Sequence, residues 1–382
     1  MRQHHTLFGI PCSLYTAKAR SYLRKQGIPF EEHSVSSKEY QAAILPTVQR
    51  MIMPVIKTAQ GDIVQDSADI IRRCEADATV KYPAVPESAV LAAISYLFEL
   101  FGGEGLLRPA MHYRWNFDKL NLNYLRSEFR CLAPAGTSEA DWPQLFDFAS
   151  GRMRKAATSF GVSDESGPVI ESAYDEFLQL FEAHLATFPY LLGGRPTLGD
   201  YALMGPLYAH LYRDPKPGLL MRQKAPRVAR WVERMNTAEE NRVDYETASD
   251  ALMSDSDLPE TLLALMRFVA VDFLPEMLAH IDFANQWLAG KPDLQPGTNG
   301  LDDPTRRFIG AAEFSWRGIT LKTSVIPYRF YLLHYLQDGY AQAADTERQA
   351  IDGVFKACGL SALLSTRTTR RVARKDHLEI WE

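Results

Sequence analysis

Cysteine is scarce in this sequence, since only four of its 382 residues are cysteines: Cys12, Cys74, Cys131 and Cys358. They are widely separated. None forms a CxxC pair or has the spacing of metal ligands, which argues against a disulfide framework and for a reducing compartment. The nine histidines are equally scattered. We therefore predict no metal site and no disulfide-stabilised fold.

Long apolar runs and a targeting segment are also missing. The longest apolar stretches, such as residues 88–101, contain a glutamate or end in glycine. None reaches the ~20 apolar residues that a membrane-spanning helix needs. Residues 1–5 lead directly into an apolar strand, without the apolar core or cleavage site of a signal peptide. By exclusion, we expect a cytoplasmic protein with no membrane partner.

Neither sign of charge dominates the chain. The formal net charge is −5 and the isoelectric point is about 6.0, so the overall charge does not favour nucleic acid or an anionic membrane as a partner. One local cluster near the C-terminus is basic. We interpret it as the solvated face of a helix, with a surface that pairs with an acidic partner as the alternative. Its members are Arg367, Arg370, Arg371, Arg374 and Lys375.

About 75 residues at the N-terminus alternate between strand and helix patterns. In order, they predict a strand, a helix, a strand, a helical or looped stretch, a hairpin around Gln60 and Gly61, and a helix capped by Asp66 or Ser67. Such a mixed alternation indicates a small α/β domain over residues 1–80. The predicted stretches are 6–10, 13–26, 29–35, 38–50, 53–57 with 62–65, and 67–74.

The rest of the chain has mainly helical patterns. Residues 76–86 are turn-rich and are interpreted as a linker, and strand signals almost vanish from residue 87 onward. Apolar residues at helical spacing predict an all-α domain over 87–245 and an α-rich extension of unknown role over 246–382. Within the extension we expect helices at 261–288 and 346–364 and a loop at 291–305.

Several short motifs resemble the glutathione S-transferase superfamily. Residues 8–23 (FGIPCSLYTAKARSYL) resemble its first strand, active-site turn and first helix, and residues 53–55 (MPV) resemble the segment whose proline is cis. Residues 65–71 (QDSADII) resemble its acidic-Ser helix start, and residues 189–203 (PYLLGGRPTLGDYAL) the capping segment of a core helix. Their order and spacing are specific for the superfamily over about residues 5–240.

This resemblance implies a thioredoxin-like α/β domain, then an all-α glutathione transferase-like domain, with the α-rich extension added. It implies glutathione as co-substrate and a cytosolic detoxification activity, in which the glutathione thiolate attacks a hydrophobic electrophile. Family members are usually homodimers. Two alternatives remain open: a thiol transferase or glutathione lyase that uses Cys12, and a binding or scaffold protein without catalysis. The second is favoured by Ile52 and Met53, which stand where the family usually has a basic residue.

The resemblance also implies positions for glutathione. Asp66 and Ser67 lie at a helix N-terminus, where free N–H groups and a carboxylate suit the γ-glutamyl end. The simpler interpretation is that they only cap the helix. A cis bond at Pro54 would let Val55 pair with the cysteinyl backbone, whereas an ordinary trans proline would begin an edge strand. Arg50, helped by Gln49 and Lys57, is expected near the glycyl carboxylate.

Two residues compete for the glutathione sulfur. Ser13 lies seven residues before Arg20, the family's spacing for a catalytic Ser or Cys, and its hydroxyl would favour the thiolate by a hydrogen bond. Cys12 would instead form a mixed disulfide with glutathione, unless it is simply a small buried hydrophobe. We rank Ser13 ahead of Cys12. Arg20 itself and Asp200, in a capping box with Thr197, are predicted to be structural.

A pocket for the second substrate is expected against the helical domain. The residues considered for it are Phe98, Phe101, Met111, Tyr113 and Trp115. The alternative is that these residues form core, because an aromatic stripe at helical spacing is more often core than pocket.

Overall fold

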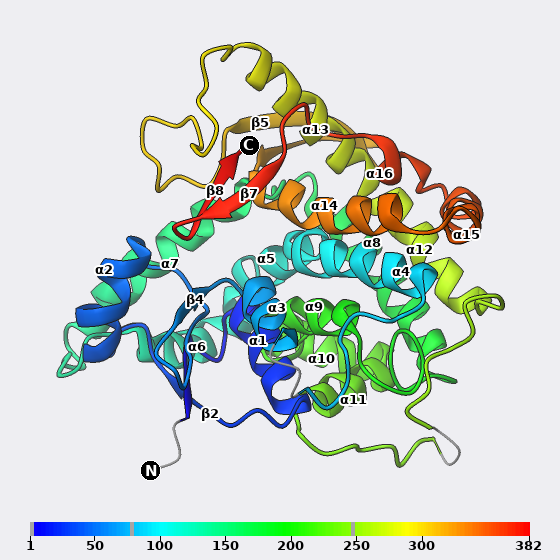
Figure 1. The fold of residues 1–382 in the computed structure, drawn as a ribbon. Coiled ribbons are helices and arrows are strands. Elements are labelled where there is room, and N and C mark those ends of the chain that lie inside the picture. The colour runs from blue at the N-terminus through cyan, green and yellow to red at the C-terminus, as the bar shows by residue number, and fades with distance from the viewer. Residues whose placement is uncertain (1–3, 77–79, 246–248) are drawn as a thin grey trace.

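The computed structural model describes residues 4–76, 80–245 and 249–382 (Figure 1). Four strands near the N-terminus form one sheet in the order β2-β1-β3-β4. They are β1 (His5–Phe8), β2 (Phe30–His33), β3 (Val55–Lys57) and β4 (Ile63–Gln65). β1 and β2 are parallel, and the β1–β3 and β3–β4 pairs are antiparallel. The predicted hairpin is therefore confirmed as β3–β4.

Helices complete this α/β unit, and the stretch left open as helix or loop is helical. They are α1 (Leu14–Lys25), the π-helix η1 (Tyr40–Ile44), α2 (Leu45–Val48) and α3 (Ser67–Glu75). Arg20 of α1 donates two hydrogen bonds to the Glu32 carboxylate, at 2.6 and 2.5 Å, and one to the carbonyl of Ile10. Arg20 thus ties the first helix to the second strand, which confirms its structural role.

The middle of the chain is all helix. Its elements are α4 (Ala89–Leu100), η2 (Phe101–Gly105), α5 (Leu107–Trp115), α6 (Asp118–Phe129), η3 (Arg130–Leu132), α7 (Trp142–Thr158), α8 (Gly167–His184), α9 (Leu198–Pro206), η4 (Leu207–Tyr212), α10 (Pro215–Lys224) and α11 (Pro226–Met235). Thr197 and Asp200 form the predicted capping box of α9, and Asp200 also accepts from the backbone N–H of Leu191. Asp200 is therefore a structural carboxylate.

One helix corrects the expectation that no segment is apolar enough to span a membrane. Residues 89–115, which comprise α4, η2 and α5, form a continuous helix of 27 residues that meets the length and hydropathy of a span. The glutamates that broke the pattern, Glu99 and Glu104, are both paired inside the fold. Most of this helix is buried in the protein, where it is the central core helix.

The extension contains two β-hairpins as well as helices, so the expectation that strands vanish after residue 87 is wrong. Its elements are α12 (Glu260–Asp272), α13 (Leu274–Ala289), β5 (Gly310–Trp316), β6 (Ile319–Val325), α14 (Pro327–Gln342), α15 (Asp345–Ala357), α16 (Ser361–Ser365), β7 (Val372–Lys375) and β8 (Leu378–Trp381). In β5 the side chains of Ala312, Phe314 and Trp316 are buried and those between them are exposed, the period-two pattern of a half-buried strand.

The extension packs onto the rest of the protein and shares its core. α14 lies along α4, and α12 lies along α8 (Figure 1). A single cluster of buried apolar side chains runs from Leu7 in β1 through Leu97 in α4 to Phe330 in α14 and Trp381 in β8. Removing the extension would therefore expose the apolar face of the central helix.

Buried charges also cross this boundary. Arg329 of α14 donates to Glu104 of η2 at 3.2 Å and to Glu276 of α13 at 2.6 Å. Arg108 of α5 donates to Glu276 at 2.6 Å. Tyr15 of α1 donates to Glu104 at 2.8 Å. This network fixes the start of α1 against the extension, because breaking one partner of a buried ion pair leaves an uncompensated charge.

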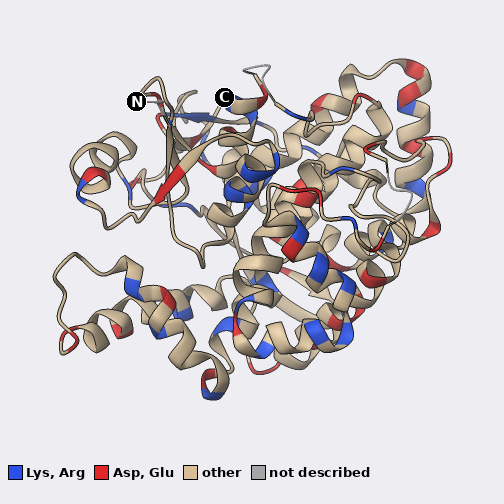
Figure 2. Cartoon of the chain, turned by 90° about the horizontal axis from the view of Figure 1, so that it is seen from below, with Lys and Arg blue, Asp and Glu red and all other residues tan. Residues whose placement is uncertain are grey.

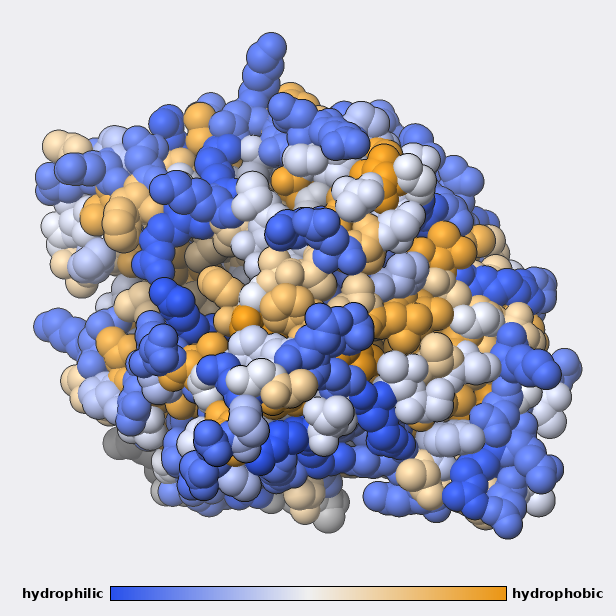
Figure 3. Space-filling model, turned by 90° about the horizontal axis from the view of Figure 1, so that it is seen from above, coloured by the Kyte–Doolittle hydropathy of each residue, from blue (hydrophilic) through white to orange (hydrophobic). Residues whose placement is uncertain are grey.

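The outer surface carries mixed charge. Lys and Arg alternate with Asp and Glu over the helices seen from below (Figure 2), which matches the small net charge of −5. Seen from above, hydrophilic side chains surround a band of apolar ones across the middle, and the surface is hollowed to the left of the centre (Figure 3).

The contact of the central helix with α9 predicts an asymmetry between two neighbouring glycines. A Cβ added at Gly102 would lie 2.6 Å from the backbone N of Leu203, whereas one at Gly103 would meet nothing within 4 Å. We expect Gly102→Ala to lower the free energy of unfolding by about 1–3 kcal/mol through overpacking. Gly103→Ala should leave it unchanged or raise it by up to about 1 kcal/mol. Urea unfolding of both variants measures this, and equal effects would contradict the close packing.

A buried histidine at the junction with the extension predicts a pH dependence. The ring of His184 lies 2.9 Å from the hydroxyl of Thr261 in α12 and 2.9 Å from the carbonyl of Leu191. Burial lowers the pKa of His184 from 6.5 to about 4. As pH falls from 6.5 to 4 the unfolded chain therefore binds a proton that the folded chain does not, and the folded state loses stability.

We expect His184→Gln to remove this loss, so that its free energy of unfolding falls less steeply with acid than that of the wild type. The difference in slope should approach about 1.4 kcal/mol per pH unit in that window. Denaturant titrations at several pH values measure it. Parallel curves for the two proteins would show that His184 does not contribute.

Candidate functional site

Ser13 stands at the start of α1, and among the described residues its hydroxyl donates no hydrogen bond. It is the N-cap residue, and its Oγ accepts a hydrogen bond from the backbone N–H of Thr16 at 3.3 Å. The side chain is half-buried. Because the oxygen is used as an acceptor, the O–H remains available as a donor to a ligand at the helix N-terminus, where a negative charge is favoured.

Cys12 has a different environment, although it is the adjacent residue. Its side chain is 2% exposed and packs with Ile10, Met111 and Trp115. Burial raises the pKa of the Cys12 thiol to about 11, with a smaller opposing effect of Arg114. A thiol that stays protonated and enclosed is a poor nucleophile, so the geometry disfavours Cys12 as the reacting group.

The proposed backbone contacts of glutathione lie at the start of β3. The peptide bond between Met53 and Pro54 is cis, as the resemblance implied. Val55 pairs with Phe8 of β1 on one side and with Gln65 of β4 on the other. Val55 thus lies inside the sheet, and its pairing with a ligand backbone stays a prediction.

Asp66 caps α3 and is fully committed to contacts within the protein. Its Oδ1 accepts from the backbone N–H of Ala68 at 2.8 Å and from the hydroxyl of Tyr328 in α14, also at 2.8 Å. Its Oδ2 lies 3.9 Å from Nη1 of Arg374 in β7. Burial alone would raise the pKa of Asp66, but Arg374 and Lys18 hold it below its ordinary value. The carboxylate is therefore ionised and already balanced by a cation.

Ser67, the next residue, is unsatisfied. It is 0% exposed, and its Oγ has no hydrogen-bond partner among the described residues. An enclosed hydroxyl without a partner is uncommon in folded proteins, since most buried polar groups are paired. Its position at the N-terminus of α3 is where the sequence placed the γ-glutamyl end of glutathione.

Arg50 is held by the C-terminal hairpin. Its Nη2 donates to the carbonyl of His377, at the β7–β8 turn, and lies 3.6 Å from Oε2 of Glu379 in β8. Gln49 and Lys57, the other residues expected near the glycyl carboxylate, have different surroundings. Lys57 pairs with Glu39 at 2.9 Å, and Gln49 is exposed in a left-handed conformation.

Arg374 corrects the interpretation of the basic cluster as a helix face. The residue lies in β7, where its Nε contacts Asp69 of α3 at 2.9 Å and its Nη2 donates to the side chain of Gln65. Its Nη1 also donates to Glu379 across the hairpin at 3.0 Å. The other interpretation, a basic surface that pairs with an acidic partner, describes Arg374 better. The acidic residues it pairs with belong to the thioredoxin-like domain of the same chain and to the hairpin itself.

Sequence reasoning missed the residues of the extension that reach this site. Tyr328 donates to Asp66, and the guanidinium of Arg307 lies 5.7 Å from the ring centre of Tyr328. The Nε of Arg307 is buried without a hydrogen-bond partner in the described part of the chain. The basic cluster was the available signal that the extension could reach this site. A single sequence does not show which distant segment packs against the N-terminal domain.

The four aromatic residues and one methionine considered for a second-substrate pocket are all buried in the two large apolar clusters. They are Phe98, Phe101, Met111, Tyr113 and Trp115. They form core in this structure, as aromatic stripes at helical spacing usually do.

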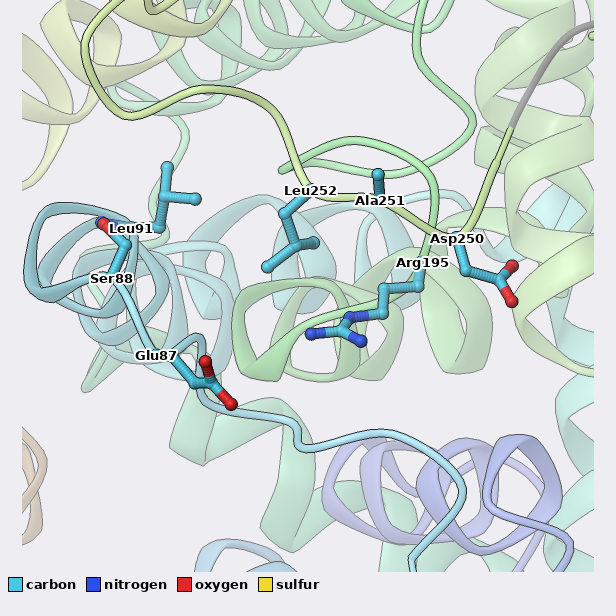
Figure 4. A pocket seen from close by; sticks show the side chains of 7 residues that line it. All are labelled: Glu87, Ser88, Leu91, Arg195, Asp250, Ala251 and Leu252. Atoms are coloured by element: carbon cyan, nitrogen blue, oxygen red, sulfur yellow. The ribbon is translucent and has the colours of Figure 1, made fainter.

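A separate cavity of about 390 Å³ lies elsewhere on the protein (Figure 4). It is formed by the start of α4, the segment before it and residues 250–252, and the side chains of Arg195 and Glu87 extend into it. None of the predicted site residues lines it. Its lining consists of Glu87, Ser88, Leu91, Arg195, Asp250, Ala251 and Leu252. Among the described residues, no group of three His, Cys, Asp or Glu side chains has the arrangement of a metal site.

Two protein families match separate parts of this chain. The family described as glutathione S-transferase, N-terminal domain, matches residues 7–80. The family described as glutathione S-transferase, C-terminal domain, matches residues 162–234. No curated protein matches the chain.

Several solved structures are similar to part of this chain at low identity. FzlA from C. crescentus is 17% identical, with 61% of this chain and 87% of that chain covered and a TM-score of 0.35. The β-etherase LigF from Sphingobium sp. strain SYK-6 is 15% identical, with 64% and 97% covered and a TM-score of 0.45. Glutathione transferase GSTFuA3 from Phanerochaete chrysosporium is 13% identical, with 63% and 98% covered and a TM-score of 0.43. Identities and TM-scores this low support no argument about activity.

The environment of Cys12 predicts an unreactive thiol. With iodoacetamide near neutral pH, Cys12 should remain unmodified in the folded protein and react only after denaturation, because its thiolate is disfavoured by burial. Peptide-resolved mass spectrometry after labelling measures this, and the denatured chain is the positive control. Rapid modification of Cys12 in the folded protein would restore the thiol transferase alternative.

Proposed function

The chain belongs to the glutathione S-transferase superfamily, and from this membership we propose that it is a glutathione-dependent transferase. In this proposal residues 1–80 bind glutathione, residues 87–245 form the all-α domain, and residues 246–382 are an addition. The second substrate is a small hydrophobic electrophile. The proposed location is the cytoplasm. The proposed oligomeric state is a homodimer, which sedimentation analysis would test.

The observation that carries this proposal is the hydroxyl of Ser13. It lies at the N-terminus of α1, half-buried, with its oxygen already accepting from Thr16. The O–H is therefore the group that would donate to a glutathione sulfur. A hydrogen bond to the charged form of a thiol lowers its pKa and raises the fraction of thiolate.

Other residues suit the remaining parts of the tripeptide. The unpaired hydroxyl of Ser67 and the N-terminus of α3 suit the γ-glutamyl carboxylate. Asp66 suits the ammonium group, Pro54 and Val55 the cysteinyl backbone, and Arg50 the glycyl carboxylate. In the reaction the thiol proton leaves to solvent and the sulfur lone pair forms a bond to an electrophilic carbon. A leaving group then departs with its electron pair, or a proton adds to complete an addition.

A binding protein without catalysis is the second candidate, and one observation favours it. Asp66 and Arg50, two of the residues proposed for glutathione, are both paired with the C-terminal extension. Such a protein would serve as a binding or scaffold protein and turn over no electrophile.

Ser13→Ala tests the catalytic proposal. We expect kcat/KM toward an activated aryl halide to fall about 10- to 100-fold, since a hydrogen bond to a charged group contributes about 1.5–3 kcal/mol. The pKa of bound glutathione, followed by the ultraviolet absorbance of the thiolate, should rise toward that of free glutathione. Ser88→Ala is the control for loss of a helix cap, because Ser88 accepts from the N–H of Leu91 at the start of α4, while its hydroxyl donates to Asp255.

Calorimetric titration with reduced glutathione tests binding itself. Ser67→Ala should weaken binding, and the stability of the variant should be unchanged or higher because the Ser67 Oγ has no hydrogen-bond partner among the described residues. Absence of binding by the wild type at millimolar glutathione, or unchanged binding by Ser67→Ala, would contradict the assignment of this site. Binding without turnover of any electrophile would select the second candidate.

A further inference from the structure

The C-terminal hairpin places opposite charges on the residues proposed for glutathione. The Arg374 cation contacts the carboxylate of Asp69 at 2.9 Å and lies 3.9 Å from that of Asp66. At the other end, the carbonyl of His377 and the carboxylate of Glu379 face Arg50. The hairpin thus presents a cation to the predicted ammonium position and acceptors to the predicted carboxylate position.

These are the charges of the two ends of glutathione itself. We propose that the β7–β8 hairpin occupies the glutathione site of its own chain and must move away before glutathione binds. This inference rests on the proposed function of the site. It assigns the extension a regulatory role, as an internal competitor whose displacement opens the site.

The electrostatics of Asp66 require displacement. Its carboxylate already accepts from Ala68 and Tyr328 and is balanced by Arg374. The ammonium group of an incoming glutathione would meet the Asp66 carboxylate, whose charge is already neutralised. It would also lie next to the guanidinium of Arg374, which carries the same positive charge. Because like charges at close range repel in a poorly solvated site, the ammonium group and Arg374 exclude each other.

The hairpin has a fixed root, which holds it to the protein. Val372 and Trp381 are each 1% exposed and belong to the main core cluster. Trp381 also exchanges backbone hydrogen bonds with the loop before β5, donating to the carbonyl of Thr298 and accepting from the N–H of Gly297. The root therefore stays in place when the tip moves.

The tip of the hairpin is held by polar contacts, and its turn residues are not the preferred ones. Asp376 and His377 form its two-residue turn with φ angles of 50° and 63°. Such a turn favours Asn-Gly, because residues other than glycine adopt positive φ at a cost. Between the outer face of the hairpin and residues 297–304 lies a cavity of about 440 Å³. The tip thus depends on the Arg374 and Glu379 contacts and has space behind it.

Two variants with opposite expected effects test the proposal in the full chain. Arg374→Ala removes the competing cation and should tighten glutathione binding about tenfold or more in a calorimetric titration. The double change Asp376→Asn/His377→Gly favours the closed turn and should weaken binding. Arg371→Ala is the matched control, because Arg371 belongs to the same segment but pairs with Asp338 and Glu382. It should bind as the wild type does.

An independent probe of access separates this proposal from the proposed function. Gln65 is 3% exposed and lies beneath Arg374. In a Gln65→Cys background, iodoacetamide should label the new thiol slowly with the native hairpin and faster with Arg374→Ala. Labelling should be slowest with the Asn-Gly turn. Peptide-resolved mass spectrometry reads the rate without any need for glutathione to bind.

The outcomes are distinct. Weaker glutathione binding by Arg374→Ala would make Arg374 a ligand contact and overturn the proposal. Labelling rates that do not respond to Arg374→Ala or to the Asn-Gly turn would overturn it too. Labelling that responds as expected, while no variant binds glutathione, would leave the hairpin as the cover of this site and refute the glutathione function alone.

Discussion

The structure of the site depends on how one buried carboxylate, that of Asp66, is satisfied. A charge at this depth needs hydrogen bonds and a counter-ion, because an isolated buried carboxylate would take up a proton. Asp66 obtains its hydrogen bonds from α3 and from Tyr328, and its counter-ion is Arg374. The helix cap is local, whereas the other two partners come from the extension. The extension is therefore part of the electrostatics of the thioredoxin-like domain.

The same coupling reaches α1 through the buried network around Glu104. Tyr15, two residues after Ser13, donates to Glu104, which in turn accepts from Arg329 of α14. Glu104 lies in the π-helical turn η2, and π-helical turns frequently occur at functional sites. Tyr328 and Arg329 of α14 thus link one helix of the extension to the cap of α3, through Asp66, and to α1, through Glu104 and Tyr15.

Local rules in the sequence account for the N-terminal fold and for the places where its site residues lie. The hairpin at Gln60 and Gly61, the caps at Ser13 and Asp66 and the capping box at Asp200 are each decided by neighbouring residues. The burial of Cys12 depends on Met111 and Trp115, about 100 residues away. The carboxylates of Asp66 and Asp69, which contact Arg374, are likewise distant in the sequence. Composition was therefore the only basis for interpreting the basic cluster. Period-two alternation around Phe314 is a local signal for β5, in a stretch for which no individual element is predicted from the sequence.

Competition between a tethered segment and a free ligand has a simple quantitative form. The apparent dissociation constant equals the intrinsic one divided by the fraction of chains in which the site is open, so a hairpin closed in about 99 of 100 chains lowers affinity about 100-fold. A partner that binds the tip only in the open state would raise glutathione affinity, and glutathione would raise the affinity of that partner by the same factor. The extension thus provides a second surface through which the state of the site can be set.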